Sequence, residues 1–294
     1  MKRILVSGIY ALAAVLLTGF MTSCSSDKEE VVPTTTAQVT FNAIFDSYNN
    51  MTRALSEGTN GIVSTWKTTD GVTVYKKGWT TNLGTLAPKA DSETNRTKLD
   101  GTVSYDGMNI GDWMDLITPR TDWDYTGQDG TISKISSTYD YAIAEAQVIY
   151  MDATDGNKIY ATDAHFTPQQ AVVKFVLLDK NGDPLNIPSL TIITKSDKLV
   201  LRRNLEGTNT TYGNLVITPA AATNTFFVAL RNDTKGADTY TLSAKVGDAV
   251  YCYTKNDFTI ANGKFMTITV TMKDMNDTYT DRQGYDNQGN ITWE

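Results

Sequence analysis

The amino-acid sequence predicts an all-β protein made of two β-sandwich domains in tandem. The first observation is an alternation of apolar and polar residues that begins at Val39 and has the period of a half-buried strand. The second is a series of about eight short β-branched and aromatic runs in the last part of the chain, separated by Asn, Asp and Gly. The third is size, because 294 residues minus a leader suit one large or two ordinary domains.

The chain begins with a segment that is typical of a secretory signal. Two cations, Lys2 and Arg3, precede an apolar run over residues 4–21, and small residues follow the run. A membrane-spanning helix, the main alternative, needs about 20 apolar residues. Polar and small residues interrupt this run, and no cluster of cations follows it. We therefore predict that residues 1–23 are a cleaved signal peptide.

The end of the leader resembles a bacterial lipoprotein signal, which is cut before a cysteine, here between Ser23 and Cys24. The resemblance implies that Cys24 carries acyl chains such as palmitate, which hold a protein to a membrane surface without spanning it. Met21 stands where such signals favour leucine, so an ordinary signal with an incidental cysteine stays open. Residues 25–30 resemble the acidic tract of surface-exported lipoproteins of Bacteroidetes, although a plain acidic tether is the alternative. The expected location is the cell outer membrane, exposed at the surface.

The first strand follows a polar, Thr-rich tether. Val39, Phe41 and Phe45 lie at alternate positions and predict the inward face of a strand over residues 39–45. Residues 47–56 then read as a loop.

The remaining first half is less regular. Strands are expected at residues 61–66, 71–75 and 102–105. Residues 141–150 are rich in alanine and would suit a buried strand or a short helix, and we favour the strand. The polar stretch 81–100 contains Pro88 and reads as a loop, whereas residues 106–140 show no clear periodicity.

The second half has a clearer pattern of short strands with turn residues between them. Strands are expected at residues 171–178, 190–194, 198–202, 214–218, 225–230, 239–245, 249–253 and 265–272. We place the junction between the two domains near His165 and Pro168.

Composition excludes several classes of function. The chain has 26 Lys and Arg against 33 Asp and Glu, and loss of Lys2 and Arg3 with the leader brings the net charge near −9. A nucleic-acid partner is not expected, because such proteins carry clustered basic residues. The spread acidity is consistent with an exposed, soluble surface.

The residues that carry chemistry are few. With Cys24 assigned to the lipid, Cys252 is alone, so no internal disulfide is expected, and it reads as a small buried apolar residue. The single histidine, His165, reads as structural, since neither a zinc cluster nor a nucleophile motif accompanies it. No catalytic residue is assigned.

One segment begins like a calcium-binding loop and then departs from the pattern. Residues 179–183 supply Asp-Lys-Asn-Gly-Asp, but Pro184 stands where such a loop needs glycine and Leu190 where it needs a bidentate glutamate. We read it as a hairpin turn. No metal, no cofactor and no enzymatic activity are predicted.

Taken together, three segments resemble the fimbrillins, which are subunits of the type V pili of Bacteroidetes. They are the lipoprotein front, the segment Met-Thr-Arg-Ala over residues 51–54, and the pair formed by residues 166–178 and 262–272. The resemblance implies two transthyretin-like β-sandwich domains and assembly by strand donation. It also implies that an arginine-specific surface protease cuts between Arg53 and Ala54.

These implications divide the chain. Residues 24–53 would form a lipidated tether with a removable first strand, residues 54–165 the first domain and residues 166–294 the second. Removing the first strand would leave the burial of Val39, Phe41 and Phe45 unfilled, at about 1.5–3 kcal/mol each. The resulting groove and free edge would accept a strand from another subunit.

The predicted donor strand is the C-terminal segment, residues 285–294. Ile291 and Trp293 alternate there with polar residues. A frayed tail after the last core strand is the alternative.

The predicted function is therefore a structural pilus subunit that serves cell adhesion. Its expected partners are other pilus subunits, the membrane before maturation, the protease, and an adhesion ligand on host or bacterial cells. The runner-up is an outer-surface lipoprotein that binds glycans for nutrient uptake, with Trp79, Trp113, Trp123 and the many tyrosines as stacking residues. Burial of these rings in the sandwich cores is the alternative. A hydrolase is a weaker third reading.

Overall fold

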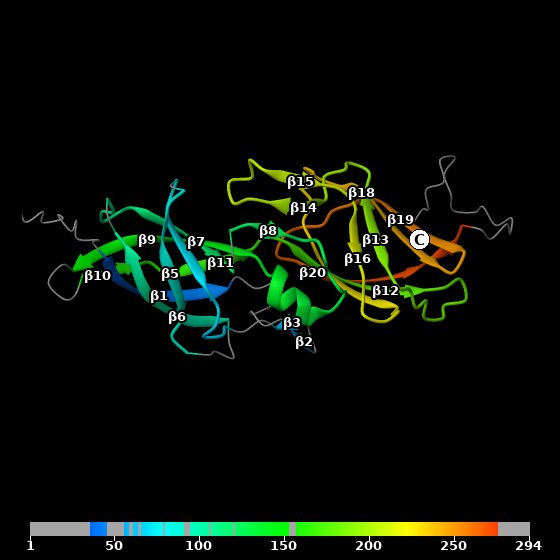
Figure 1. The fold of residues 1–294 in the computed structure, drawn as a ribbon, viewed down its shortest axis with the longest axis horizontal. Helices are drawn as coiled ribbons and strands as arrows, with labels where there is room; N and C mark the ends of the chain where they lie inside the picture. The colour runs from blue at the N-terminus through cyan, green and yellow to red at the C-terminus, as the bar shows by residue number, and fades with distance from the viewer. Residues whose placement is uncertain are drawn as a thin grey trace, which may run out of the picture. The chain divides into compact units, whose positions relative to one another are not determined.

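The computed structural model describes residues 36–45, 56–58, 61–63, 66–78, 80–90, 95–105, 107–119, 121–152 and 157–275. These residues belong to one compact unit (Figure 1). Almost all of the regular structure is strand, and the helical part consists of α1 (Ile132–Lys134) and a π-helical turn, η1 (Ile135–Tyr139). The all-β prediction is confirmed. No helix within the described ranges is long and apolar enough to cross a membrane.

The first half forms a sheet that closes on itself. Its strands are β1 (Thr36–Phe45), β4 (Val72–Lys76), β5 (Asn82–Pro88), β6 (Arg96–Ser104), β7 (Trp113–Thr118), β9 (Ala142–Asp152), β10 (Lys158–Ala161) and β11 (Ala164–Pro168). The order is β10-β1-β11-β9-β7-β4-β5-β6, and β1 also pairs with β6. Strand β1 thereby joins the two ends of the sheet around one apolar core. A separate short hairpin pairs β2 (Ser56–Gly58) with β3 (Gly61–Val63).

The prediction of a loop over residues 81–100 is wrong, because β5 and most of β6 lie there. Few apolar residues mark these strands, since only one face of each lies against the core. Pro88 stands at the end of β5, where a missing N–H costs least. Gly101 lets β6 approach β5, because a Cβ there would lie 2.7 Å from the Thr85 carbonyl oxygen.

The second half has two facing sheets around a second core. One sheet has the order β17-β12-β20 and the other β16-β13-β18-β19-β21. Their bounds are β12 (Ala171–Leu178), β13 (Leu190–Thr194), β16 (Leu215–Ile217), β17 (Thr225–Leu230), β18 (Asp238–Val246), β19 (Ala249–Phe258), β20 (Phe265–Thr271) and β21 (Lys273–Asp274). The strands predicted at 171–178, 190–194 and 225–230 match these bounds, because each is a short run with a clear turn on either side.

The junction predicted near His165 and Pro168 coincides with a strand. These residues belong to β11, which pairs with β1 on one side and β9 on the other. The link from the first sheet to β12 is therefore Gln169 and Gln170. The division into two domains at residue 165 stays a prediction.

Residues 121–141, almost all of them in the stretch that shows no clear periodicity in the sequence, pack against the second half. Strand β8 (Trp123–Asp124) pairs with β14 (Val200–Arg203), which pairs with β15 (Thr210–Tyr212). A third cluster of buried side chains includes Trp123, Tyr141 and Ala229. This segment, here called the clamp, inserts between β7 and β9 in the chain.

One buried glutamine of the clamp, Gln128, forms hydrogen bonds to both backbone groups of Ala229 on β17. The Gln128 amide donates to the Ala229 carbonyl at 2.8 Å, and its oxygen accepts the Ala229 N–H at 2.8 Å. The Gly130 carbonyl accepts the Phe227 N–H at 2.8 Å, and the Gln128 carbonyl accepts that of Thr218 at 3.0 Å. The clamp thus hydrogen-bonds to the outer edge of β17 and to Thr218, the residue that follows β16.

Candidate functional site: the seat of the first strand

Strand β1 is an interior strand with a partner on each edge. It pairs antiparallel with β6 over nine positions, from Thr36 opposite Ser104 to Ile44 opposite Arg96. On its other edge it pairs in parallel with β10 and then with β11. Figure 1 shows β1, in blue, between these strands. Because both edges are paired, the strand completes the sheet.

The inward side chains of β1 complete the first core. Val39, Phe41 and Phe45 are at most 5% exposed, and Ala37 before them and Ala43 between Phe41 and Phe45 lie on the same face. The alternation read from the sequence is therefore present in the fold. Ile44 is also buried, although it lies on the opposite face.

The end of β1 is held by an aromatic cluster. The Phe45 ring lies 4.7 Å from the ring of Trp66 and 5.4 Å from that of Phe166, measured between centroids. Trp66 meets Phe166 edge to face at 5.4 Å. Such pairs contribute about 0.5–1.5 kcal/mol beyond the area they bury. The sequence does not single out Trp66 or Phe166 for this position.

Asn95 forms hydrogen bonds to the same end of β1 through its backbone and its side chain. Its carbonyl accepts the Phe45 N–H at 3.0 Å and the Trp66 indole N–H at 3.3 Å. Its amide donates to the Phe45 carbonyl at 3.0 Å. The final residue of the strand is therefore bound at both backbone groups.

The outward side chains of β1 are also engaged. The Gln38 amide and the Thr40 hydroxyl donate to Asp100 Oδ1 at 2.6 and 2.9 Å, and the Asn42 amide donates to Asp163 at 2.9 Å. The bond from Gln38 lowers the pKa of Asp100 below its ordinary value. Partial burial opposes this shift, and the bond from Thr40 adds to it.

The other predicted site residues lie outside the described residues. These are Ser23 and Cys24 at the signal, Arg53 and Ala54 at the maturation site, and Ile291 and Trp293 in the donor strand. The structure brings together Val39, Phe41 and Phe45 alone. Their role in a removable strand stays a prediction.

The tryptophans proposed for sugar stacking differ in position. Trp123 is 3% exposed, so its assignment to a sugar platform is wrong: it packs in the clamp with Tyr141, with ring centroids 5.9 Å apart. Trp113 is exposed, and Trp79 lies outside the described residues.

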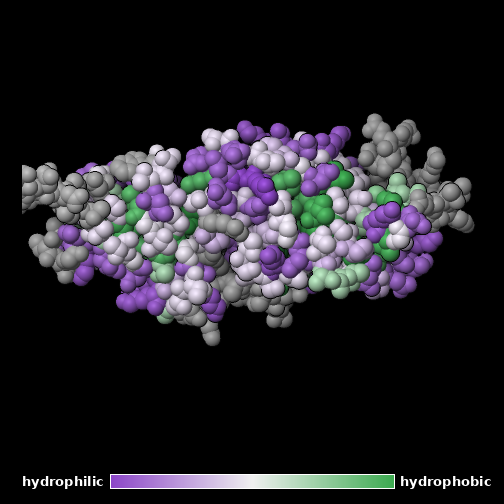
Figure 2. Space-filling view, viewed as in Figure 1, coloured by the Kyte–Doolittle hydropathy of each residue, from purple (hydrophilic) through white to green (hydrophobic). Residues whose placement is uncertain are grey.

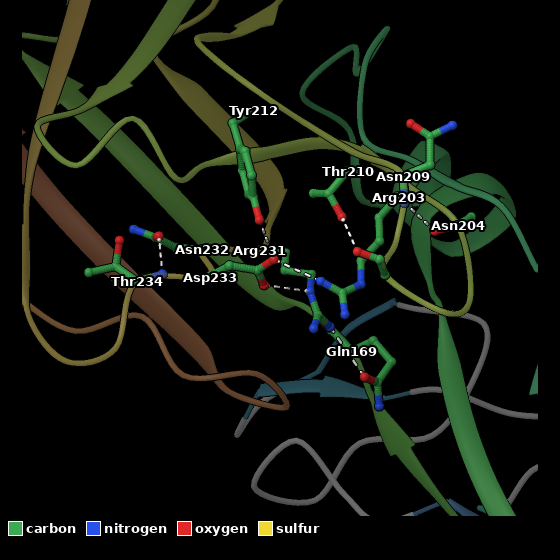
Figure 3. A network of polar contacts seen from close by, with 11 residues as sticks. Gln169, Arg203, Asn204, Asn209, Thr210, Tyr212, Arg231, Asn232, Asp233 and Thr234 are labelled. Carbon is green, nitrogen blue, oxygen red and sulfur yellow. Dashed lines mark hydrogen bonds and ion pairs between the residues drawn. The ribbon is translucent and has the colours of Figure 1, made fainter.

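Arg203 and Arg231 meet at Asp233 in a polar network that the sequence does not reveal (Figure 3). Arg203 Nη1 lies 2.8 Å from Asp233 Oδ2, and Arg231 Nε lies 3.2 Å from Asp233 Oδ1. The two guanidinium carbons lie 6.0 and 5.0 Å from the Trp123 ring centroid. Arg231 also donates to the Gln169 carbonyl at 2.8 Å. The network holds the clamp and the link before β12 to the second half.

The residues considered for chemistry make structural contacts. Asp179 Oδ1 accepts the N–H groups of Asn181 and Asp183 at 2.8 and 2.9 Å, as a turn requires. Within the described ranges no group of His, Cys, Asp and Glu could hold a metal ion. Cys252 is half-buried rather than buried, with its Sγ 3.8 Å from the Ser243 hydroxyl. His165 lies on the exposed face of β11.

Comparison with known proteins gives structural neighbours alone, since no family model and no curated protein matches. One neighbour, described as a cell adhesion protein from Bacteroides ovatus, has 14% identity and a TM-score of 0.45 over 80% of this chain and 94% of its own. A fimbrial assembly protein from Parabacteroides distasonis has 11% identity and a TM-score of 0.43 over 80% and 91%. A protein from Bacteroides uniformis described as a cell adhesion protein has 12% and 0.41 over 82% and 95%.

Proposed function

We propose that this chain is a structural subunit of a type V pilus that serves cell adhesion. It is exported as an outer-membrane lipoprotein on Cys24, matured by an arginine-specific surface protease between Arg53 and Ala54, and polymerised by strand donation. The role is structural rather than catalytic, and the mature subunit resides in the fimbrium.

The observation that carries the proposal is the place of β1 in the first sheet. The strand is paired on both edges and fills the core, and it is the first strand among the described residues. Arg53 follows its last residue, Phe45, by eight positions. A cut there would leave β1 held by non-covalent contacts alone. Its departure would open two strand edges and an apolar groove at once.

The vacated seat would suit a strand from another subunit. It offers backbone partners on β6 and on β10 and β11, together with an apolar floor that includes Trp66 and Phe166. Addition of a strand gains affinity from main-chain hydrogen bonds and specificity from alternate side chains. Residues 285–294, with Ile291 and Trp293 at alternate positions, are the proposed donor.

The lipid on Cys24 would act before assembly. In the precursor it holds the chain at the membrane, and cleavage at Arg53 separates it from the folded part. The anchor therefore serves delivery to the surface.

Proteolysis of the lipidated precursor tests maturation. Treatment with an arginine-specific protease should give a mature N-terminus at Ala54, read by mass spectrometry. The variants Arg53→Ala and Arg53→Lys should both resist this cut, the second while keeping the charge. Cleavage confined to other arginines would contradict the proposal, as would an uncut precursor.

Assembly is tested on cells by electron microscopy. Overexpression of the chain should give surface fibres, and Arg53→Ala or deletion of residues 285–294 should abolish them. Recovery of residues 39–45 within purified fibres would contradict the exchange of β1.

A further inference from the structure

Exposed apolar side chains concentrate on one face of the first sheet. Of seven large apolar residues that are exposed in the described part of the chain, five lie on or beside β7, β9 and β10. They are Ile110, Trp113, Ile149, Tyr150 and Tyr160, between 40% and 61% exposed, and are here called the aromatic face. In the view of Figure 2 most of the surface is hydrophilic or intermediate, with separate apolar patches over both halves. Clustered exposure of this kind marks an interaction site.

A β-bulge builds the centre of the face. Tyr150 pairs with Tyr160, but the next pair joins Val148 to Ala161, which leaves Ile149 as an extra residue. Bulges re-aim side chains in this way, and here two consecutive residues, Ile149 and Tyr150, are both exposed. The rings of Tyr150 and Tyr160 consequently lie side by side, with centroids 5.7 Å apart and planes 39° apart.

Trp113 supplies a third ring on the same surface, at a second position. It pairs with Gln147 on β9, three residues before Tyr150. Because Ile149 is the extra residue of the bulge, the two aromatic positions are separated by about two strand steps, roughly 7 Å at about 3.3 Å per residue. A ligand that reaches both must therefore be extended.

Polar groups surround these rings. Lys77 Nζ lies 2.7 Å from Glu145 Oε1 and 5.7 Å from the Trp113 ring centroid. The Gln147 amide donates to the Gly111 carbonyl at 3.0 Å. The hydroxyls of Tyr150 and Tyr160 have no hydrogen-bond partner in the described part of the chain. Flat rings are thus combined with donors and acceptors.

This chemistry selects one class of ligand. Sugar rings present an apolar face to an aromatic ring and a rim of hydroxyls to polar groups, which matches the combination of Tyr, Trp, Gln and Glu. Lys77 pairs with Glu145, and Asp115 lies opposite Glu145 on β7, so two carboxylates accompany one ammonium and a negatively charged ligand is disfavoured. A protein partner would instead favour an interface core depleted of charged residues.

We propose that the aromatic face binds a neutral oligosaccharide, with Tyr150 and Tyr160 stacking one part of it and Trp113 another. The binding would give the adhesive role proposed above its ligand, and so deepens that function. The contact itself does not require a polymer, because every residue belongs to one chain.

The experiment uses the purified full-length chain carrying Arg53→Ala, so that a failure of pilus assembly does not affect the measurement. It is applied to an array of neutral, sialylated and sulfated oligosaccharides. Binding to neutral members is expected, and calorimetry with the strongest one gives the dissociation constant. Trp113→Ala and Tyr160→Ala should each weaken it about tenfold. Val216→Ala, an exposed apolar residue off the face, should leave it unchanged.

Circular dichroism and the thermal midpoint establish that each variant is folded. If Tyr160→Ala fails to fold, Tyr160→Phe, which keeps the ring and removes the hydroxyl, is measured in its place, and Trp113→Ala carries the test of stacking. Absence of binding to neutral oligosaccharides overturns the proposal. So does binding that Trp113→Ala and Tyr160→Ala leave intact. Concentration-dependent self-association lost in these variants, without sugar binding, would identify a contact between copies and would also overturn it.

Discussion

Strand β1 and the clamp both complete the edges of sheets, yet they do so by different means. Strand β1 uses a long register of backbone pairs, and its side chains follow a simple inward and outward alternation. The clamp uses a two-residue strand, one buried glutamine, and a tryptophan beneath two arginines. The first arrangement would accept another strand of the same period. The second depends on individual side chains, so no generic strand would replace it.

The largest effect is expected at the inward end of β1. Phe45→Ala should lower the free energy of unfolding by about 3–5 kcal/mol, because it removes a ring packed on Trp66 and Phe166. Urea unfolding of the uncut chain measures the loss. Asn42→Ala, on the outward face of the same strand, should change stability by less than about 1 kcal/mol. Equal losses of stability for Phe45→Ala and Asn42→Ala would contradict the burial of the Phe45 side chain in the core.

Substitution of one glutamine in the clamp and one in β1 compares how much each region depends on a single side chain. Gln128→Met keeps the side-chain length but leaves the N–H and carbonyl of Ala229 buried without partners, so it should cost about 3 kcal/mol.

Gln38→Met on β1 removes bonds that water can replace, and should cost about 1 kcal/mol or less. Thermal unfolding of both variants makes the comparison. A smaller loss for Gln128→Met than for Gln38→Met would show that the clamp does not depend on its glutamine.

The ion pairs of Asp233 with Arg203 and Arg231, next to Trp123 of the clamp, should contribute more to stability than an exposed surface pair. Asp233→Ala leaves two largely buried arginines without their shared carboxylate and should cost about 2 kcal/mol. Glu145→Ala removes the exposed pair with Lys77 and should cost less than about 1 kcal/mol. The difference should persist in high salt, because buried pairs are screened less. If the difference between the two stability losses disappeared in high salt, the Arg203 and Arg231 guanidinium groups would be solvent-exposed.

The smallest expected effect is on the loss of stability as pH falls. The folded-state pKa of Asp100 is lowered by its bond from Gln38, so its contribution is present above the ordinary pKa of about 3.9 and is lost as pH falls through the lowered value. Asp100→Asn should therefore lose less stability than the parent between about pH 5 and pH 3. Parallel thermal midpoints across that range would exclude Asp100 as a link between β1 and β6.

The accuracy of the sequence-based predictions follows the regularity of each segment. Residues 171–178 and 225–230 were predictable because their apolar runs are short and bounded by turns. Strands β5 and β6 were not, since Leu83, Leu86 and Leu99 are sparse and polar residues occupy the outward face. Sequence reasoning placed Trp123 among exposed rings, whereas it is buried beneath Arg203 and Arg231.

What the sequence determined by itself is the all-β class and the inward face of β1, because a strand's period of two is visible in neighbouring residues. Only the tertiary structure decided which strands border β1, and that Gln128 meets Ala229, 101 residues away. It also decided that a bulge exposes Tyr150 beside Tyr160. A local pattern states which face of a strand is apolar. The partner that covers it depends on how the whole chain closes its sheets.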